Sequence, residues 1–199
     1  MGTVTAGSAT ITINGGALYL GSGGIVKNGA SGLATNLNFS SGTLGANADW
    51  TTNLNINLPT GGNITFRTAD AATSAHNITL NGVVSGNGGF TKSGSGRLVL
   101  GASNTFGGAV SINGGTLDVD GSISAGTAVV VNSGGTITGD GSVNRNIVIN
   151  SGSALRPGGA LNGSVLHGTS LTWNAGAVMS FDLDNTDQSA CAYRGTDER

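Results

Sequence analysis

One short unit recurs along this 199-residue chain: an alternating apolar strand, a turn of Asn with Gly or Ser, and a second short strand. The clearest copies are ITINGGALYL from Ile11, VSINGGTLDV from Val110, VVVNSGGTIT from Val129, IVINSGSALR from Ile147 and LTWNAGAVMS from Leu171. The apolar residues after the turn recur at a nearly constant interval, at Leu117, Ile137, Leu155 and Val178, and weaker copies place Leu44 and Ile64 at a similar interval. A period of about 20 residues with two or three short strands is typical of a β-solenoid.

The alternation within each copy predicts which side chains face the core, because successive residues of a strand point to opposite faces. In the unit from Val110, the predicted inward set is Val110, Ile112, Leu117 and Val119. The predicted outward set is Ser111, Thr116, Asp118 and Asp120. The Asn-Gly and Gly-Gly pairs are predicted to form the corners, since Gly and Asn tolerate positive φ and Asn can bond to its own backbone.

The repeats therefore predict an all-β fold, a right-handed parallel β-helix (β-solenoid) of about ten coils with about 20 residues per coil. A single solenoid segment is expected over residues 1–187. A sandwich or barrel built of hairpins is the alternative, because Asn-Gly is also a strong hairpin signal. The solenoid is favoured because the copies resemble one another at a nearly constant period, and no two strands form a specific antiparallel pair.

The composition narrows the classes of protein further. Gly, Asn, Ser and Thr make up about half of the chain, and charged residues only 9%. These four residue types weaken helices, and two prolines without a three-residue glycine period exclude collagen. A net charge of −2, with eight scattered basic residues, argues against nucleic-acid binding. Disorder is the remaining competitor, but a hydrophobic fraction of 37% in alternating runs favours folded strands.

The two ends of the chain carry separate expectations. The first residues lack the basic and apolar regions of a signal peptide, so the protein either stays inside the cell or is an internal piece of a longer chain. No stretch approaches the roughly 20 apolar residues of a membrane helix. The last twelve residues, 188–199 (QSACAYRGTDER), hold the only Cys and the only Glu and show no alternation, so we expect a disordered, anomalous tail. A single cysteine suits either a secreted bacterial protein or simply a Gly-rich composition.

Candidate chemical groups are few. His76 and His167 are far apart in sequence and are interpreted as solvated surface residues, and Cys191 has no neighbouring His to activate it. Asp118, Asp120 and Asp140 form the one acidic group on the solenoid proper; solvated corner residues are the simplest interpretation, with weak calcium binding or glycoside hydrolysis as alternatives. Asp182, Asp184 and Asp187 lack the Gly and distal Glu of a calcium loop and are interpreted as a solvated linker.

Other motifs also favour structural interpretations. The Gly-rich segments 86–89 and 94–96 resemble phosphate loops only in composition, since no helix and no Gly-Lys-Ser/Thr follows. The pairs Thr10/Thr12 and Thr136/Thr138 are a weak hint of an ice-binding array. Trp50 and Trp173 are expected in packing roles, with a carbohydrate platform as the alternative. We therefore predict no catalytic residue, no cofactor and no metal site.

One stretch carries a family resemblance. GSGRLVLGASNTFGGAVSINGGTLDV, from Gly94 to Val119, resembles the passenger-associated transport repeat, also called the autotransporter-associated β-strand repeat. The matching residues are Gly94, Gly96, Leu98, Leu100, Asn104, Thr105, Gly108, Ile112, Gly115, Thr116, Leu117 and Val119. Phe106 stands where Tyr is usual, Arg97 replaces Thr, and Ala102 replaces Gly. Residues 94–187 resemble such proteins well and residues 1–91 more loosely.

The resemblance implies a parallel β-helix from a bacterial autotransporter-like passenger, at the cell surface or outside the cell. Its expected function is a non-enzymatic stalk that aids export and folding across the outer membrane. Its expected partners are the outer-membrane translocation machinery or a C-terminal barrel of its own. An adhesin that binds glycans or other cells is the alternative, and a polysaccharide lyase or hydrolase a more remote one. The Asp-rich linker leads into no further strand, so we expect truncation or a frameshift near Gln188.

Overall fold

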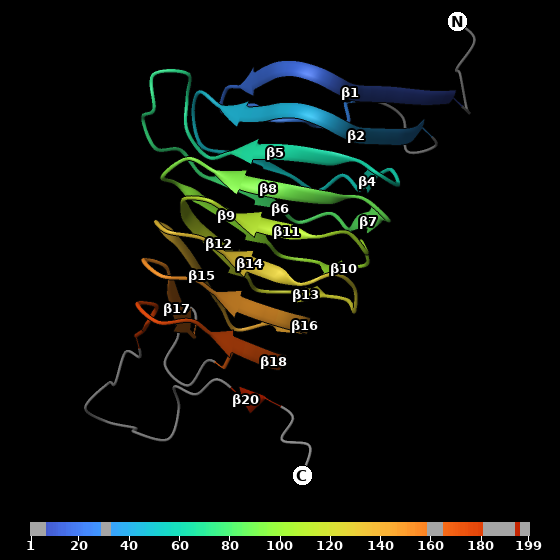
Figure 1. Ribbon diagram of the computed structural model, residues 1–199. Coiled ribbons are helices and arrows are strands. Elements are labelled where there is room, and N and C mark those ends of the chain that lie inside the picture. Colours follow the sequence, from blue (N-terminus) through green and yellow to red (C-terminus); the bar gives the residue numbers. More distant parts are fainter. Residues whose placement is uncertain (1–6, 29–32, 159–164, 181–193, 196–199) are drawn as a thin grey trace, which may run out of the picture.

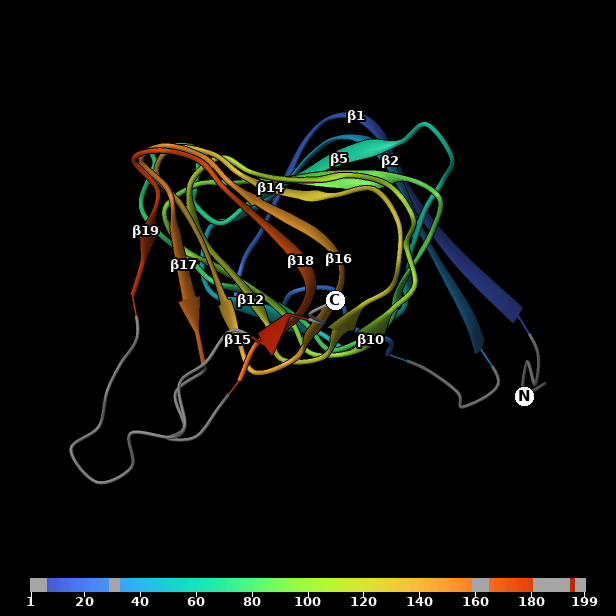
Figure 2. The ribbon, with the colours of Figure 1, turned by 60° about the horizontal axis from the view of Figure 1, so that its bottom comes forward.

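A computed structural model describes residues 7–28, 33–158, 165–180 and 194–195 of the protein. These residues contain only strands, turns and bends, with no helix among them. The strands pair in parallel and wind into a β-solenoid of about seven turns, about 22 residues apart (Figure 1). Seen from below, successive coils lie over one another as one wound tube (Figure 2).

Each coil visits three columns of stacked strands in the same order. Four long strands bend from the first column into the second: β1 (Gly7–Leu20), β2 (Leu33–Ala46), β16 (Ser142–Ile149) and β18 (His167–Trp173). The first column also contains β4 (Ile56–Leu58), β7 (Val84–Gly86), β10 (Ser103–Asn104), β13 (Ser122–Ile123) and β20 (Arg194–Gly195). The second also contains β5 (Asn63–Arg67), β8 (Gly89–Ser93), β11 (Val110–Ile112) and β14 (Val129–Val131).

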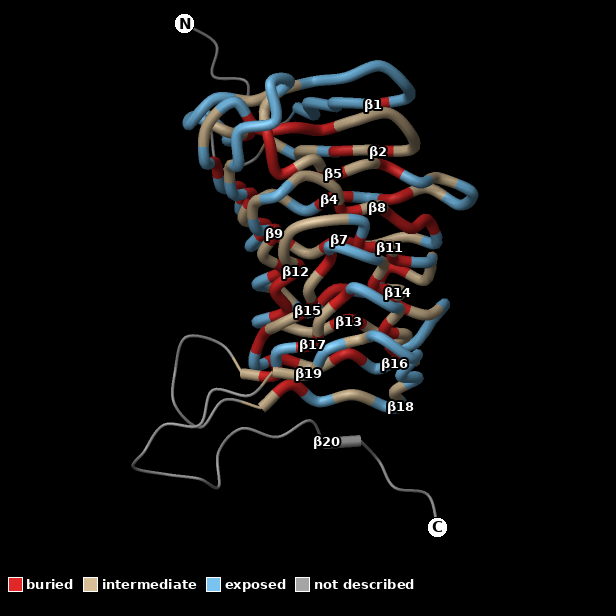
Figure 3. Tube along the Cα trace, turned by 60° about the vertical axis from the view of Figure 1, so that its left-hand side comes forward, coloured by how far each residue is buried: buried red, intermediate tan, exposed pale blue. Residues whose placement is uncertain are grey.

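The third column is a separate seven-stranded sheet. It consists of β3 (Trp50–Thr52), β6 (Ile78–Leu80), β9 (Arg97–Leu100), β12 (Gly115–Val119), β15 (Gly135–Gly139), β17 (Ala154–Pro157) and β19 (Val178–Met179). The three columns enclose one continuous apolar core. In Figure 3 the buried residues are red, and they recur from coil to coil along the tube.

The core is built from side chains that stack in register from coil to coil. One second-column stack comprises Leu18, Leu44, Phe66, Lys92, Ile112, Val131, Ile149 and Trp173. A third-column stack comprises Trp50, Ile78, Leu98, Leu117, Ile137, Leu155 and Met179. No coil has a core of its own, so each apolar side chain is buried mainly by the coils above and below it.

The structure corrects the coil count and two details of the register. The prediction of ten coils is too high, because the period is longer than predicted and varies along the chain. Near the N-terminal end, for example, Leu18 stacks on Leu44, a wider spacing than that between Leu117 and Ile137. Leu44 stacks on Phe66 rather than Ile64, and Leu155 pairs with Met179 rather than Val178. The loops between columns vary in length, so spacing alone misplaces these partners.

The predicted inward set is confirmed, with one error in the outward set. Val110, Ile112, Leu117 and Val119 are all fully buried. Asp118 was expected to face water, but its side chain is also fully buried. It lies on β12 between Val99 of β9 and Thr138 of β15.

The recurring Asn of the repeat forms a ladder at the corner between the second and third columns. The Asn132 amide donates to Asn113 Oδ1 at 2.7 Å, Asn150 donates to Asn132 Oδ1 at 2.9 Å, and Asn174 donates to Asn150 Oδ1 at 2.7 Å. The sequence predicts these corners with Asn bonded to its own turn, whereas here each of these amides donates to the Asn of the preceding coil. Each ladder contact fixes the register of one coil on the next.

Candidate functional site

The two histidines lie in different settings. His76, half-buried, precedes β6, with Nδ1 3.7 Å from Asp49 Oδ1 and Nε2 4.0 Å from Asp70 Oδ2. His167 is exposed at the start of β18. His76 is therefore a partly exposed histidine that lies between two carboxylates. Among the described residues, no group of three His, Cys, Asp or Glu is arranged to hold a metal ion.

The acidic group of the third column is divided by the structure. Buried Asp118 pairs with the Arg97 guanidinium, which is partly exposed. Asp120 and Asp140 are both exposed. Desolvation raises the pKa of Asp120, the nearby Asp140 carboxylate raises it further, and Arg97 opposes the shift. The arrangement is an internal ion pair beside two interacting surface carboxylates, and the predicted trio does not share one environment.

The remaining predicted groups occupy scattered positions. Trp50 is a core residue, 3% exposed, and its Nε1 donates to the Gly45 carbonyl at 3.3 Å. Trp173 is exposed on the last strand of its stack. Thr10 and Thr12 lie in the first column and Thr136 and Thr138 in the third, so they build no common array. The predicted residues outside the described part of the chain are Asp182, Asp184, Asp187 and Cys191.

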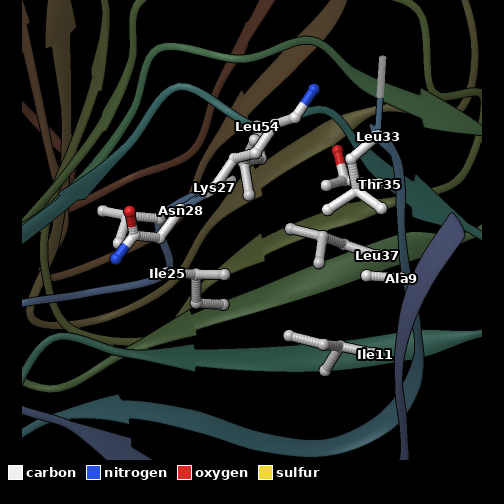
Figure 4. A pocket seen from close by; sticks show the side chains of 10 residues that line it. Ala9, Ile11, Ile25, Lys27, Asn28, Leu33, Thr35, Leu37 and Leu54 are labelled. Atoms are coloured by element: carbon white, nitrogen blue, oxygen red, sulfur yellow. The ribbon is translucent and has the colours of Figure 1, made fainter. Parts of the chain in front are cut away.

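A pocket of about 220 Å³ lies at the N-terminal end of the solenoid, between β1, β2 and the segment after β1 (Figure 4). Ile11, Ile25, Leu33, Leu37 and Leu54 form most of its apolar wall, and Lys27 is also among the lining residues. None of the carboxylates described above lines it. The pocket therefore lacks the paired acids that glycoside hydrolysis requires.

Lys92 is the most unusual side chain in the structure. It is fully buried, and in the core stack it lies between Phe66 and Ile112. Its ammonium donates to the carbonyls of Gly94 and Gly114, both at 2.8 Å, and of Ser93 at 3.1 Å. Burial lowers the pKa of Lys92 from 10.5 to about 7, while the three carbonyl oxygens favour the charged form.

The glycines of the repeat make room for this ammonium. Gly115 has a φ of +62°, and a Cβ there would lie 2.8 Å from Lys92 Nζ. Gly94 has a φ of +78°, which turns its carbonyl into the corner where Nζ lies. Both positions therefore require the conformational freedom of glycine. Because Gly94 and Gly114 belong to successive coils, one lysine binds two corners together.

Asn104 joins three coils in the first column, at the point where the sheet is interrupted between β7 and β10. Its Oδ1 accepts from the Val84 amide at 2.9 Å. Its Nδ2 donates to the carbonyls of Ala102 at 2.7 Å and Ser122 at 3.1 Å. This buried side chain adds to the backbone bonds that Thr105 and Gly107 donate to Val84 and Gly86, and all its polar atoms have partners, as burial requires.

Arg145 is a second buried cation, 3% exposed, at the corner between the two halves of β16. Its guanidinium donates to the carbonyls of Phe106, Gly108, Ser124 and Thr127 at 2.7–2.9 Å. It also lies 4.9 Å from the centre of the Phe106 ring. Burial lowers the pKa of Arg145 to about 10. The side chain ties its own coil to the two preceding ones.

Neither buried cation is among the residues predicted from the sequence to have a special role, although the pattern carries a signal for both. Lys92 follows Phe90 by two residues, and Arg145 lies between Val143 and Ile147, so each occupies an inward position of the alternating pattern. Asn104 offered no comparable signal beyond its place in the family motif. All three side chains form hydrogen bonds that join neighbouring coils.

Residues 90–119 match the family model described as the passenger-associated-transport-repeat. The chain carries this repeat. The matched residues run from β8 to β12, and so contain Lys92, Asn104 and Gly115. No curated protein and no solved structure matches the chain. In the described part, no helix is long and apolar enough to cross a membrane.

The matched stretch is longer than one coil. It covers one full coil and the beginning of the next, so that Lys92 meets Ile112 and Leu98 meets Leu117 within the same matched stretch. A motif of one coil alone would contain no stacking contact. The passenger-associated transport repeat thus includes the parts of one coil together with contacts that stack it on the next.

Proposed function

We propose that this chain is a non-enzymatic structural segment of an autotransporter-like passenger, a stalk that folds coil by coil as it is exported. The observation that carries the proposal is the repeat itself, whose buried Lys92 and Asn104 bond to neighbouring coils. A newly formed coil then offers the next one a template of strand edges and carbonyl acceptors. The outer-membrane translocation machinery, or a barrel joined to the passenger, is the proposed partner.

The distribution of exposed apolar residues supports a stalk over an adhesin. An adhesive face requires a contiguous apolar or aromatic patch. The large hydrophobic residues exposed in the described part belong to the first and last coils, and they are Ile11, Leu18, Val26, Trp173 and Val178. The long sides of the solenoid instead present Ser, Thr and Asn. Glycan or cell binding by a side face therefore remains the less supported function.

The proposal is tested by placing the full chain between a signal peptide and a β-barrel translocator in a Gram-negative bacterium. We expect the chain to reach the surface, as measured by its digestion when protease is added to intact cells. Leu117→Asp places a charge in the core stack and should reduce surface display several-fold, because the coils after it cannot stack. Thr116→Asp, on the outward side of the same strand, is the matched control and should be displayed normally.

Two results would contradict the proposal. One is retention of the wild-type chain in the periplasm while a control passenger is displayed. The other is equal display of Leu117→Asp and the wild type, which would mean that stacking makes no contribution to export.

A further inference from the structure

One member of the Asn ladder differs from the others. Asn132 and Asn150 both donate through Nδ2 and accept through Oδ1, and Asn174 donates to Asn150. Asn113 only accepts: its Oδ1 receives the bond from Asn132 Nδ2, and within the described part of the chain its own amide donates to no group. Asn113 is also the one ladder member that is followed by glycine, since the other three precede serine or alanine.

An Asn-Gly pair has a chemistry of its own, because glycine has no side chain to hinder attack by its backbone nitrogen on the asparagine Cγ. The glycine N–H gives its proton to a base from the solvent, and the new bond between N and Cγ closes a succinimide ring. The bond between Cγ and Nδ2 breaks, and Nδ2 leaves as ammonia. Water then opens the ring at either carbonyl and gives aspartate or isoaspartate. Water is consumed and ammonia is released, with no oxidation or reduction.

The corner at Asn113 and Gly114 is open to this reaction in the folded chain. Asn113 is exposed, and among the described residues the Gly114 N–H donates to no acceptor. Gly114 is loosely packed, because a Cβ there would lie 3.7 Å from the nearest atom beyond its chain neighbours, the Gly94 carbonyl oxygen. The ring therefore has room to close, and the attacking nitrogen has no hydrogen bond to lose.

Two polar groups stabilise the charges that develop during the reaction. When the nitrogen attacks Cγ, negative charge gathers on Asn113 Oδ1, and the Asn132 Nδ2 donor already lies 2.7 Å from that oxygen. A donor placed on a developing oxyanion lowers the barrier. The Lys92 ammonium, bonded to the Gly114 carbonyl at 2.8 Å, places a positive charge near the nitrogen that must lose its proton.

A second exposed Asn-Gly pair shows what the sequence alone does not distinguish. The Gly88 N–H, which follows Asn87, donates to the Leu58 carbonyl at 2.9 Å. Gly88 is also tightly packed, because a Cβ there would lie 2.4 Å from the Pro59 carbonyl oxygen. The nitrogen that would attack is thus already bonded, and the ring has little room. The two pairs have the same sequence and different surroundings.

We propose that Asn113 is a site of spontaneous deamidation in the folded chain, with Asn132 as the donor that stabilises the oxyanion. The aspartate formed at this position keeps the ladder intact, because a carboxylate oxygen accepts from Asn132 as the amide oxygen does. Isoaspartate instead adds a methylene group to the main chain and shifts the Gly114 carbonyl away from Lys92. Deamidation of Asn132 or Asn150 would remove a donor of the ladder, and neither is followed by glycine.

The test follows deamidation of the purified full chain at neutral pH by mass spectrometry of its proteolytic peptides. In the folded chain Asn113 should convert about tenfold faster than Asn87, and in concentrated urea the two should convert at similar rates. Asn132→Ala should slow conversion of Asn113 about tenfold, because the oxyanion loses its donor. Asn150→Ala removes the next bond of the same ladder without touching Asn113, so this matched control should leave the rate unchanged.

The Asn132 variant separates the proposal from a purely structural role of the ladder. A ladder that only holds the corner rigid predicts faster conversion of Asn113 when Asn132 is removed, which is the opposite sign. The proposal is overturned by that result, by an unchanged rate in Asn132→Ala, or by equal conversion of Asn113 and Asn87 in the folded chain. None of these readouts depends on export, so the proposed stalk function is tested separately.

Discussion

The buried Lys92 predicts that the stability of this solenoid increases from neutral to alkaline pH. Its pKa is about 7 in the folded chain and about 10.4 in an unfolded chain. Between these values the unfolded chain binds a proton that the folded chain releases, so stability rises with pH. Between pH 6 and pH 9 this group should therefore raise the free energy of unfolding by about 3 kcal/mol. Below pH 6 it is constant, because the amine is charged in both states.

The assay is urea unfolding followed by tryptophan fluorescence at pH 6 and pH 9, with buried Trp50 as a reporter of the core. Lys92→Met keeps the length of the side chain without its charge, so the rise of about 3 kcal/mol should disappear. Lys27→Met, at an exposed position of the first coil, is the matched control and should keep it. The reasoning is refuted if Lys92→Met and the wild type gain equal stability between the two pH values.

Two further substitutions test the bonds that join the coils. Asn104→Ala removes three hydrogen bonds of a buried side chain and should lower the free energy of unfolding by about 2–4 kcal/mol, whereas Asn57→Ala, on an exposed amide ladder, should cost less than about 0.5 kcal/mol. Arg145→Met removes all four carbonyl contacts of the guanidinium and should cost about 3 kcal/mol or more, while Arg156→Met at an exposed site should be nearly neutral. Urea midpoints measure both pairs, and equal losses within a pair would count against the assigned bonds.

The sequence predicts the solenoid because the alternation of apolar and polar residues that defines each strand is a local pattern. Val110 and Ile112 alternate with polar residues, and that pattern alone places them inside. The same rule fails at Asp118, whose outward position is covered and whose charge is balanced by Arg97 from the preceding coil. Burial of an outward residue depends on what packs over the sheet, and alternation carries no information about that.

The number of coils and the bonds between them were harder to predict for a different reason. The loop between β5 and β6 is longer than that between β8 and β9, so the repeat has no constant length and dividing the chain by its shortest period overestimates the turns. Partners such as Asn104 and Ser122 lie on different coils, and their pairing follows only when the register is known. The core residues of each coil can thus be predicted from the sequence, whereas the contacts between coils can be identified only from the structure.

The parallel stacking of coils at intervals of about 22 residues also determines how much conformational entropy is lost when one more coil folds onto the solenoid. Closing one further coil orders a loop of that length, which costs about 3 kcal/mol by the logarithmic dependence on loop length. That cost is the same for the first added coil and for the last, because each new strand pairs only with its immediate predecessor. The relative contact order of such a rod therefore falls as the rod lengthens. A solenoid of this kind can therefore become longer without any of its folding steps requiring contacts between residues far apart in the sequence.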